Sequence, residues 1–206
     1  MKKHWYDYMW ISTVLYTLLG CFNILFAWLG LACFIIPIGV AIFSSNKAYC
    51  NKYCGRGQLF ALLGGKLKLS RNKTPPRFLY SNWFRYGFLA FFMTMFGLMV
   101  AYTVQVFQGA PLRQAVKLLW VFKMPWNWAY WGVSVTPWVA QFAFGFYGVM
   151  LTATVLGLIT MIIYKPRSWC VYCPMGTMTQ GICMLKHTED WNCPWRKKSQ
   201  ESPTQL

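Results

Sequence analysis

The sequence predicts an all-α integral membrane protein with four transmembrane helices, arranged as two repeated hairpins that are each followed by a pair of cysteines on the cytoplasmic side. Three observations support this class: long runs without charge, an uneven distribution of basic residues around those runs, and two similar Cys pairs. Of the 206 residues, 57% are hydrophobic and only 12% are charged, which is about half the charged fraction of a soluble globular protein. The composition therefore excludes an ordinary soluble domain.

Three long segments lack Asp, Glu, Lys and Arg altogether, namely residues 8–46, 86–112 and 124–164. A helix needs about 20 predominantly apolar residues to cross a bilayer. Each run is therefore long enough to contain a membrane span. The basic N-terminus resembles that of a signal peptide, but the apolar run that follows is too long and no cleavage site closes it. We expect this segment to be retained.

The first run has room for two helices. We expect a hairpin with helices at about 6–26 and 30–46 and a turn near Leu29 and Gly30. A single long first helix is the alternative, and it leaves the Cys-bearing segments on the same side of the membrane. The later runs predict a third span at residues 84–107 and a fourth at 138–164.

The net charge of +16 would suggest a nucleic-acid partner in a soluble protein. Here only Arg113, Lys117 and Lys123, of the 20 basic residues, fall on the side opposite to the N-terminus and the C-terminal tail. Cytoplasmic loops of membrane proteins carry the excess of Lys and Arg. We therefore expect a multi-pass protein of a bacterial-type inner membrane, with its N-terminus, Cys pairs and C-terminus in the cytoplasm. Membrane lipid is then a partner and nucleic acid is not.

Two segments are expected to lie along the membrane surface. Residues 111–123 place charges on a mostly apolar stretch, which is typical of an interfacial helix. Tryptophans of the kind that anchor a chain at this level follow it: Trp126, Trp128, Trp131 and Trp138. We interpret this segment as membrane anchoring, with a quinone- or partner-docking surface as the alternative. On the cytoplasmic side, residues 57–69 predict a similar helix and residues 70–76 a solvated basic turn.

Six of the eight cysteines lie on the predicted cytoplasmic side. The other two, Cys21 and Cys33, fall in the first hairpin, where a thiol usually acts as a small packing residue. The segments AYCNKYCGRG and SWCVYCPMG both run aromatic, Cys, then Tyr, Cys, then Gly or Pro, with a further Gly two residues on. This similarity predicts a duplicated unit. The first unit spans residues 1–83, the second spans 84–182, and a basic polar tail occupies 183–206.

Parallel repeats would bring both Cys pairs to the same face and depth, so that four thiols converge: Cys50, Cys54, Cys170 and Cys173. A short step between two cysteines presents two sulfurs from one turn of backbone, and two such steps supply the four thiolates that an iron-sulfur cluster or a soft metal ion prefers. We therefore expect these four cysteines to bind a metal cofactor.

The residues around the pairs suit an anionic centre. A small or rigid residue follows each pair, and the next Gly lets main-chain N–H groups approach the sulfurs and starts a helix with its positive end toward the site. Nearby cations would stabilise thiolates: Lys47, Lys52, Arg56, Lys165 and Arg167. Only two acidic residues, Glu189 and Asp190, lie near these segments.

The same thiols allow other chemistry. Structural zinc takes the same four thiolates, and a catalytic dithiol could exchange with quinone. Copper handling is a further alternative, because Cu(I) accepts thioethers and methionines stand near the second pair: Met175, Met178 and Met184. A permanent disulfide is disfavoured in the cytoplasm. Cys183 and Cys193 are additional candidate ligands, the latter in a Cys-Pro step typical of ferredoxins.

Several classes have no support. The two histidines, His4 and His187, lie outside the predicted spans, so a membrane-embedded bis-His haem site of the b-type cytochromes is excluded. The sequence contains no Gly-rich phosphate loop, no Ser-His-Asp set and no paired carboxylates, so hydrolase and nucleotide chemistry are not indicated.

At these residues the chain resembles the membrane-bound 4Fe-4S proteins related to NapH, the quinol-dehydrogenase subunit of periplasmic nitrate reduction, and to the membrane part of NosR. The resemblance covers the first hairpin, the first Cys pair, the basic stretch through Arg85 and the second unit through Pro174. That family repeats Cys-x3-Cys-Pro after helix hairpins and moves electrons between quinol, iron-sulfur centres and a periplasmic acceptor. The resemblance implies that Cys50, Cys54, Cys170 and Cys173 are the cysteines of the redox site.

The chain departs from the family at three points. Gly55 stands where the family usually has Pro, two residues rather than three separate the second pair, and a soluble double-ferredoxin tail is missing. The chain therefore resembles a minimal member with one cluster, most simply a [4Fe-4S] cluster. Because one cluster cannot deliver electrons across a hydrocarbon core of about 30 Å, we expect partner redox subunits such as a cytochrome, a flavoprotein or a ferredoxin-like protein, with quinol as a candidate donor and quinone as a candidate cofactor. The expected function is an electron-transfer subunit of an oxidoreductase complex rather than a self-sufficient enzyme.

Overall fold

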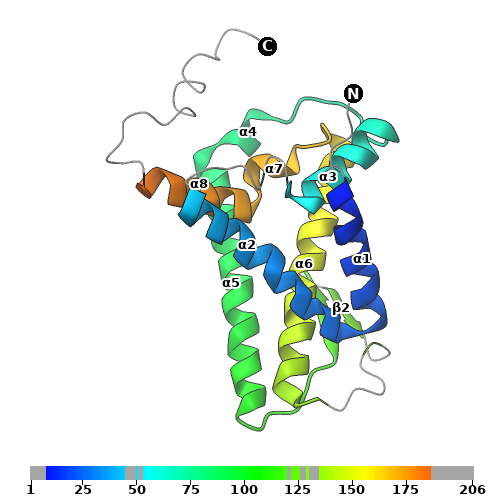
Figure 1. Ribbon diagram of the computed structural model, residues 1–206, viewed down its shortest axis with the longest axis vertical. Coiled ribbons are helices and arrows are strands. Elements are labelled where there is room, and N and C mark those ends of the chain that lie inside the picture. Colours follow the sequence, from blue (N-terminus) through cyan, green and yellow to red (C-terminus); the bar gives the residue numbers. More distant parts are fainter. Residues whose placement is uncertain are drawn as a thin grey trace.

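The computed structural model describes residues 8–44, 50, 53–119, 122–125, 129 and 135–186, and most of these residues are helical (Figure 1). The elements follow one another as α1 (Met9–Phe22), the 3₁₀-helix η2 (Ile24–Trp28), α2 (Leu29–Ser44), α3 (Gly55–Ala61), the π-helix η4 (Leu62–Lys66), α4 (Arg77–Tyr80), α5 (Asn82–Phe107), strands β1 (Ala115–Leu118) and β2 (Phe122–Pro125), α6 (Pro137–Ile163), α7 (Trp169–Tyr172) and α8 (Pro174–Lys186).

Three helical segments of the described chain are long and apolar enough to cross a membrane: Ile24–Phe43, Asn82–Phe107 and Pro137–Ile163. This result agrees with a mainly α-helical membrane protein, and two of the segments coincide with the spans predicted at residues 84–107 and 138–164. Helix α1 has 14 residues, which gives it a length of about 21 Å at 1.5 Å per residue. That is shorter than a hydrocarbon core of about 30 Å, so a membrane span formed by the first predicted helix, and with it a total of four spans, stays a prediction.

The first hairpin turns at Asn23, not near Leu29 and Gly30 as expected. Asn23 is extended (φ −143°) and its side-chain oxygen accepts a hydrogen bond of 3.0 Å from the Leu25 N–H. It thereby ends α1 and starts the next helical segment. Gly30 is instead a packing position inside α2, where a Cβ would come within 2.8 Å of the Phe146 ring. The small residue that looked like a turn therefore allows two helices to approach.

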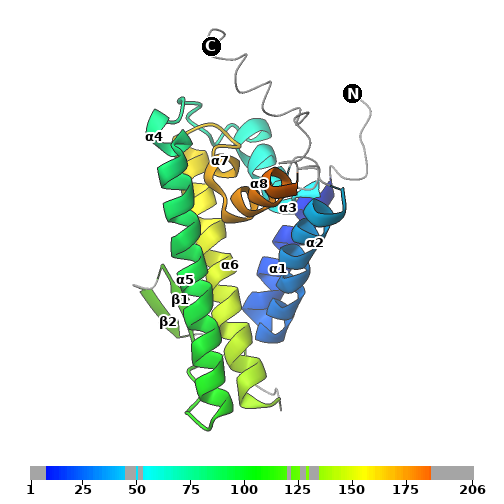
Figure 2. The ribbon, with the colours of Figure 1, turned by 90° about the vertical axis from the view of Figure 1, so that its left-hand side faces the viewer.

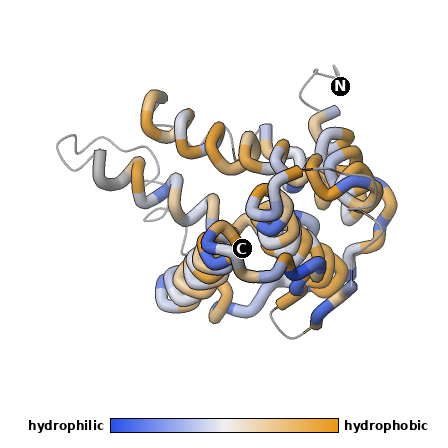
Figure 3. Tube along the Cα trace, turned by 90° about the horizontal axis from the view of Figure 1, so that it is seen from below, coloured by the Kyte–Doolittle hydropathy of each residue, from blue (hydrophilic) through white to orange (hydrophobic). Residues whose placement is uncertain are grey.

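Helices α5 and α6 lie side by side and form the long axis of the molecule (Figures 1 and 2). Hydrophobic residues occupy much of the length of the helices (Figure 3). Helix α6 is the most enclosed of the three membrane-length segments. Its residues Phe144, Phe146 and Tyr147 are almost fully buried, and a core cluster joins Phe144 and Tyr147 to Ile24 of η2 and Val116 of β1.

Residues 111–123 do not form the predicted interfacial helix. They contribute β1 and β2, an antiparallel pair in which Val116 is opposite Met124 and Lys117 is opposite Lys123. Val116 is fully buried, and the Lys117 carbonyl oxygen lies so close to Gly148 of α6 that a Cβ there would come within 2.8 Å of it. Packing of an extended backbone against α6 therefore overrides the helical pattern of charges. Trp126, Trp128 and Trp131 are outside the described residues, and Trp138 in α6 is exposed.

The Cys-bearing elements gather at one end of the molecule. Helices α3, α4, α7 and α8 all lie at the end opposite to the α5–α6 connection (Figures 1 and 2). Helix α3 packs against α1, and α8 packs against α2 and α5, so elements of the two predicted units contact each other directly. The helix predicted at residues 57–69 begins at Gly55 and ends at Lys66. Residues 71–74 are exposed and irregular, as expected of a solvated turn.

Candidate metal centre

The second cysteine of each pair stands immediately before a helix. Cys54 precedes α3, and its carbonyl oxygen accepts a hydrogen bond of 3.0 Å from the Gln58 N–H. Cys173 precedes α8, and its carbonyl oxygen accepts one of 2.9 Å from the Thr177 N–H. The main-chain N–H groups of Met175 and Gly176 also donate to the Cys173 sulfur. The expectation that backbone donors approach the sulfurs is therefore confirmed at the second pair.

Gly57 lies between sulfurs from the two predicted units. A Cβ built on Gly57 would stand 3.7 Å from the Cys170 Sγ and 3.8 Å from the Cys54 Sγ. Both sulfurs therefore face one small space that this glycine leaves open. Cys54 and Cys170 are 116 positions apart in the chain. They come close because α3 and α7 both pack against α6.

The other two predicted ligands lie in the same region of the molecule. Cys170 interacts electrostatically with Cys173, Cys54 and Cys50. The Cys50 Sγ is 3.8 Å from the Thr179 Oγ1 of α8, which ties the first pair to the helix that follows the second pair. The structure thus places Cys54 and Cys170 beside one glycine, and Cys50 and Cys173 interact electrostatically with Cys170.

The proximity of these cysteines does not by itself give them the arrangement of metal ligands. Among the residues that the structure describes, no group of three or more Cys, His, Asp or Glu side chains is arranged to hold a metal ion. Metal sites commonly close around the ion as it binds, because ligands must lose protons and give up other contacts. Of the additional candidates, Cys183 is half-buried further along α8, whereas Cys193, His4 and His187 lie outside the described residues.

Burial dominates the protonation of these thiols. Burial raises the pKa of the Cys170 thiol from 9.0 to about 12; Cys173, Cys54 and Cys50 raise it further, and Arg167 opposes the shift. Burial also raises the pKa of Cys173 against donors from Gly176 and Met175 and the charge of Arg56. At Cys170 and Cys173 the nearby cations, which were expected to stabilise thiolates, therefore lower the pKa less than burial raises it. A reactive dithiol needs a lowered pKa, and the raised pKa values of Cys170 and Cys173 do not favour thiol-disulfide exchange at this pair.

Arg56 of α3 is one of two described cations whose charge acts on the thiols of the site; the other is Arg167. The Arg56 guanidinium donates from Nη2 to the Met150 Sδ at 3.2 Å, whereas Nε is buried without a hydrogen-bond partner. All four acidic residues of the chain lie outside the described residues, so no described carboxylate pairs with it. Its charge acts instead on Cys173. Arg56 would thus balance negative charge that appears on the sulfurs.

Gly55 has a structural reason to stand where the resembled family has Pro. A Cβ on Gly55 would lie 2.5 Å from the Met9 carbonyl oxygen and 2.6 Å from the Thr13 Oγ1. No side chain fits between α3 and α1 at this point. Helix packing beside the site therefore explains the glycine at this position.

Cys21 and Cys33 belong to the first hairpin, and Cys33 interacts electrostatically with Cys54 and Arg56 of the site. One contact of the site was not foreseen from the sequence. Cys21 has its sulfur 3.4 Å from the Tyr147 Oη, in agreement with a packing role, and Cys33 is exposed on α2. Thr179 was missed because nothing in the sequence indicates that α8 folds back to Cys50.

No protein-family model, curated protein or solved structure matches the chain.

Proposed function

We propose that the protein is a membrane iron-sulfur electron-transfer subunit that relays single electrons between a cytoplasmic or quinol donor and a partner redox subunit of an oxidoreductase complex. One observation carries the proposal: sulfurs from the two Cys pairs face the same space at Gly57. A reason is needed for two distant segments to bury thiols together, and a shared cofactor supplies one. Cys50, Cys54, Cys170 and Cys173 would hold it.

The chemistry of the donors fits an iron-sulfur cluster. The described ligands at the site are thiols alone, the set that holds [4Fe-4S] clusters. The absent side chain of Gly57 leaves space between two of them, and the N–H groups of Met175 and Gly176 are donors of the kind that tune cluster sulfurs. Arg56 offers an unpaired buried N–H and a positive charge. The bound cluster would supply one-electron redox chemistry, and the protein would hold, orient and shield it.

The membrane arrangement follows from the same proposal. The end that carries the thiols also carries most of the described cations, among them Lys66, Lys68, Arg71, Lys73 and Arg167, so we assign it to the cytoplasm by the positive-inside rule. With α1 as a further span, the protein would have the four spans predicted from the sequence. A cluster confined to one end requires a haem, flavin or quinone carrier in a partner subunit to move electrons across the membrane.

Anaerobic purification in detergent, followed by iron and sulfide analysis and by EPR spectroscopy after dithionite reduction, tests the proposal. We expect one reducible cluster in the wild-type protein and its loss in both Cys54→Ser and Cys170→Ser. Cys21→Ser is the matched control, because the Cys21 sulfur contacts the Tyr147 Oη at 3.4 Å and its loss should leave the cluster intact. Loss of the cluster in only one of the two site variants would contradict a centre shared between the pairs.

The same preparation separates the alternatives. Structural zinc would appear as stoichiometric zinc without sulfide, because the same four thiolates suit that ion. Copper handling would appear as bound Cu(I), for which Met175 and Met178 of α8 are additional donors. A metal-free protein whose thiols alkylate readily at neutral pH would indicate a dithiol oxidoreductase. Each of these results would overturn electron relay through a cluster.

A further inference from the structure

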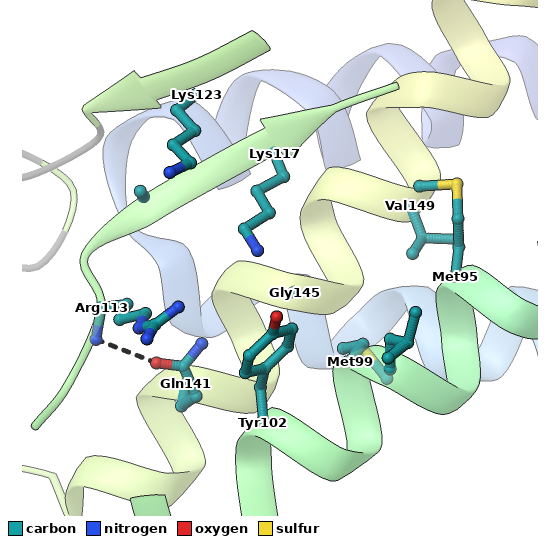
Figure 4. Close-up of a pocket in the computed structure, with 11 residues that line it drawn as sticks. Met95, Met99, Tyr102, Arg113, Lys117, Lys123, Gln141, Gly145 and Val149 are labelled. Atoms are coloured by element: carbon teal, nitrogen blue, oxygen red, sulfur yellow. Dashed lines mark hydrogen bonds between the residues drawn. The ribbon is translucent and has the colours of Figure 1, made fainter. Parts of the chain in front are cut away.

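A second site lies between α5, α6 and the β1–β2 hairpin, toward the end of the molecule opposite to the thiols (Figures 2 and 4). It is a cavity of about 400 Å³, a volume within the usual range of ligand pockets. Basic side chains enter it from the strands and from the segment before them, and apolar side chains line it from the two helices. This site shares no residue with the candidate metal centre.

The pocket concentrates positive charge. Arg113, Lys117 and Lys123 all line it, and these are the three basic residues on the side opposite to the thiols. Lys117 and Lys123 stand directly opposite each other on the paired strands, an arrangement of like charges that is destabilising by itself. No carboxylate occurs in the described parts of the chain to offset this repulsion. An anion bound in the pocket would do so.

Two further polar groups hold these cations in place. The Lys117 Nζ lies 4.5 Å, and the Arg113 Cζ 5.4 Å, from the centre of the Tyr102 ring, so one aromatic face attracts both charges. The side chain of Gln141, which is almost fully buried, accepts a hydrogen bond of 3.0 Å from the Arg113 N–H. The charged end of the pocket is therefore built from three separate elements around one space.

Polarity changes along the depth of the pocket. Tyr102 and Gln141 lie about 6 to 8 Å from the connected ends of α5 and α6, whereas Met95 and Val149 lie about 18 Å from those ends, at 1.5 Å per residue. Tyr102 and Gln141 are thus nearer the end of the bundle than Met95 and Val149. The Lys117 backbone packs beside Gly148, close to the level of Val149, and its amino group reaches back to the Tyr102 ring. This order matches the headgroup and chain of a lipid that is aligned with the helices.

We propose that this pocket binds the phosphate group of an acidic diacyl phospholipid, with the first part of an acyl chain lying along Met95, Met99 and Val149. The three cations would contact the phosphate, and the open side at the exposed residues Arg113 and Lys123 would admit the lipid. The proposal is independent of the iron-sulfur function, because it concerns other residues and needs no metal.

Native mass spectrometry of the purified protein in non-ionic detergent tests the proposal, with phosphatidylglycerol as the probe. We expect one tightly retained phosphatidylglycerol, about tenfold weaker binding in Lys117→Gln and again in Lys123→Gln, because a charge-assisted hydrogen bond contributes enough for a factor of this size. Lys73→Gln, which removes a cation from an exposed turn, is the matched control and should bind as the wild type does. Lys123 is exposed, so its variant should fold normally.

Two comparison ligands separate the contributions. Diacylglycerol with the same chains lacks the phosphate and should not compete, and inorganic phosphate lacks the chains and should compete only at far higher concentration. Equal binding of phosphatidylglycerol by all three variants, or equal competition by diacylglycerol, would overturn the proposed phosphate site. Inorganic phosphate that competes as well as the lipid would overturn the acyl-chain part and indicate a site for free phosphate.

Discussion

Replacing Gly57 by alanine separates the stability of the fold from the capacity to bind a cluster. The new Cβ would stand 3.7 Å from the Cys170 Sγ, 3.7 Å from the Cys54 Cβ and 3.8 Å from the Cys54 Sγ. These distances are ordinary van der Waals contacts, so the methyl group fits the metal-free protein without strain. Because Gly57 is inside α3, and alanine favours a helix over glycine by about 0.5 to 1 kcal/mol, the metal-free variant should be slightly more stable.

The cluster should respond in the opposite direction. The methyl group fills the space between two sulfurs that a cluster must bridge, and iron and sulfide would have to displace it. We expect Gly57→Ala to lose most of its iron and sulfide while its thermal unfolding temperature without metal is unchanged or raised by a few degrees. Iron analysis, EPR spectroscopy and thermal unfolding in detergent measure both effects on one preparation.

Gly55→Ala is the matched comparison. Its Cβ would collide with the Met9 carbonyl oxygen at 2.5 Å, and overpacking of this kind costs about 1 to 3 kcal/mol. That variant should therefore be destabilised with or without metal. Full iron content and an unchanged EPR signal in Gly57→Ala would refute the inference that a cluster bridges Cys54 and Cys170 beside this glycine.

Two further predictions concern the elements around the site. Phe60→Ala should destabilise the protein by about 3 to 5 kcal/mol, as for buried phenylalanines in general, because Phe60 is fully buried with its ring against Gly157; thermal unfolding measures this loss. The raised pKa of Cys170, about 12 instead of 9.0, means that the folded metal-free protein keeps a proton that the unfolded chain has already lost. Its stability should therefore fall as pH rises from 9 toward 12, and Cys170 should alkylate slowly at pH 8.

Clear results would contradict these two predictions. Leu67→Ala removes an exposed side chain and should not change unfolding, so equal effects of Leu67→Ala and Phe60→Ala would show that burial is not the cause. The pH prediction fails if the metal-free protein gains stability above pH 9, or if mass spectrometry finds Cys170 alkylated as fast as an unfolded thiol.

The long apolar segments could be predicted because length and lack of charge are themselves the physical requirement for crossing a bilayer. The predicted third and fourth spans therefore agree with α5 and α6 within a few residues. The turn of the first hairpin could not be predicted, because Gly30 looks like a turn residue but serves close packing. Whether a small residue bends the chain or admits a neighbour depends on the tertiary structure.

The β1–β2 hairpin illustrates a different difficulty. Four-residue strands carry too little periodicity to distinguish them from an amphipathic helix, and charges at 113, 117 and 123 suit either. Burial of Val116 against α6 decides the conformation, and the sequence alone does not contain that contact. The pocket that these charges line was missed for the same reason.

The proximity of Cys54 and Cys170 could be predicted because a similar Cys segment follows two of the long apolar segments. The protonation of the thiols could not, because it depends on the depth at which Cys170 and Cys173 are buried. A count of neighbouring cations overestimates their effect when desolvation is the larger contribution. Contacts such as that of Cys50 with Thr179 likewise require the fold of α8.

The most direct test of the central claim is an anomalous diffraction map of the anaerobically prepared protein, recorded at the iron absorption edge. The account predicts one iron peak, located beside Gly57 between the sulfurs of Cys54 and Cys170 and within ligand distance of Cys50 and Cys173. A peak at the zinc edge in that position, or an iron peak elsewhere in the molecule, would contradict it.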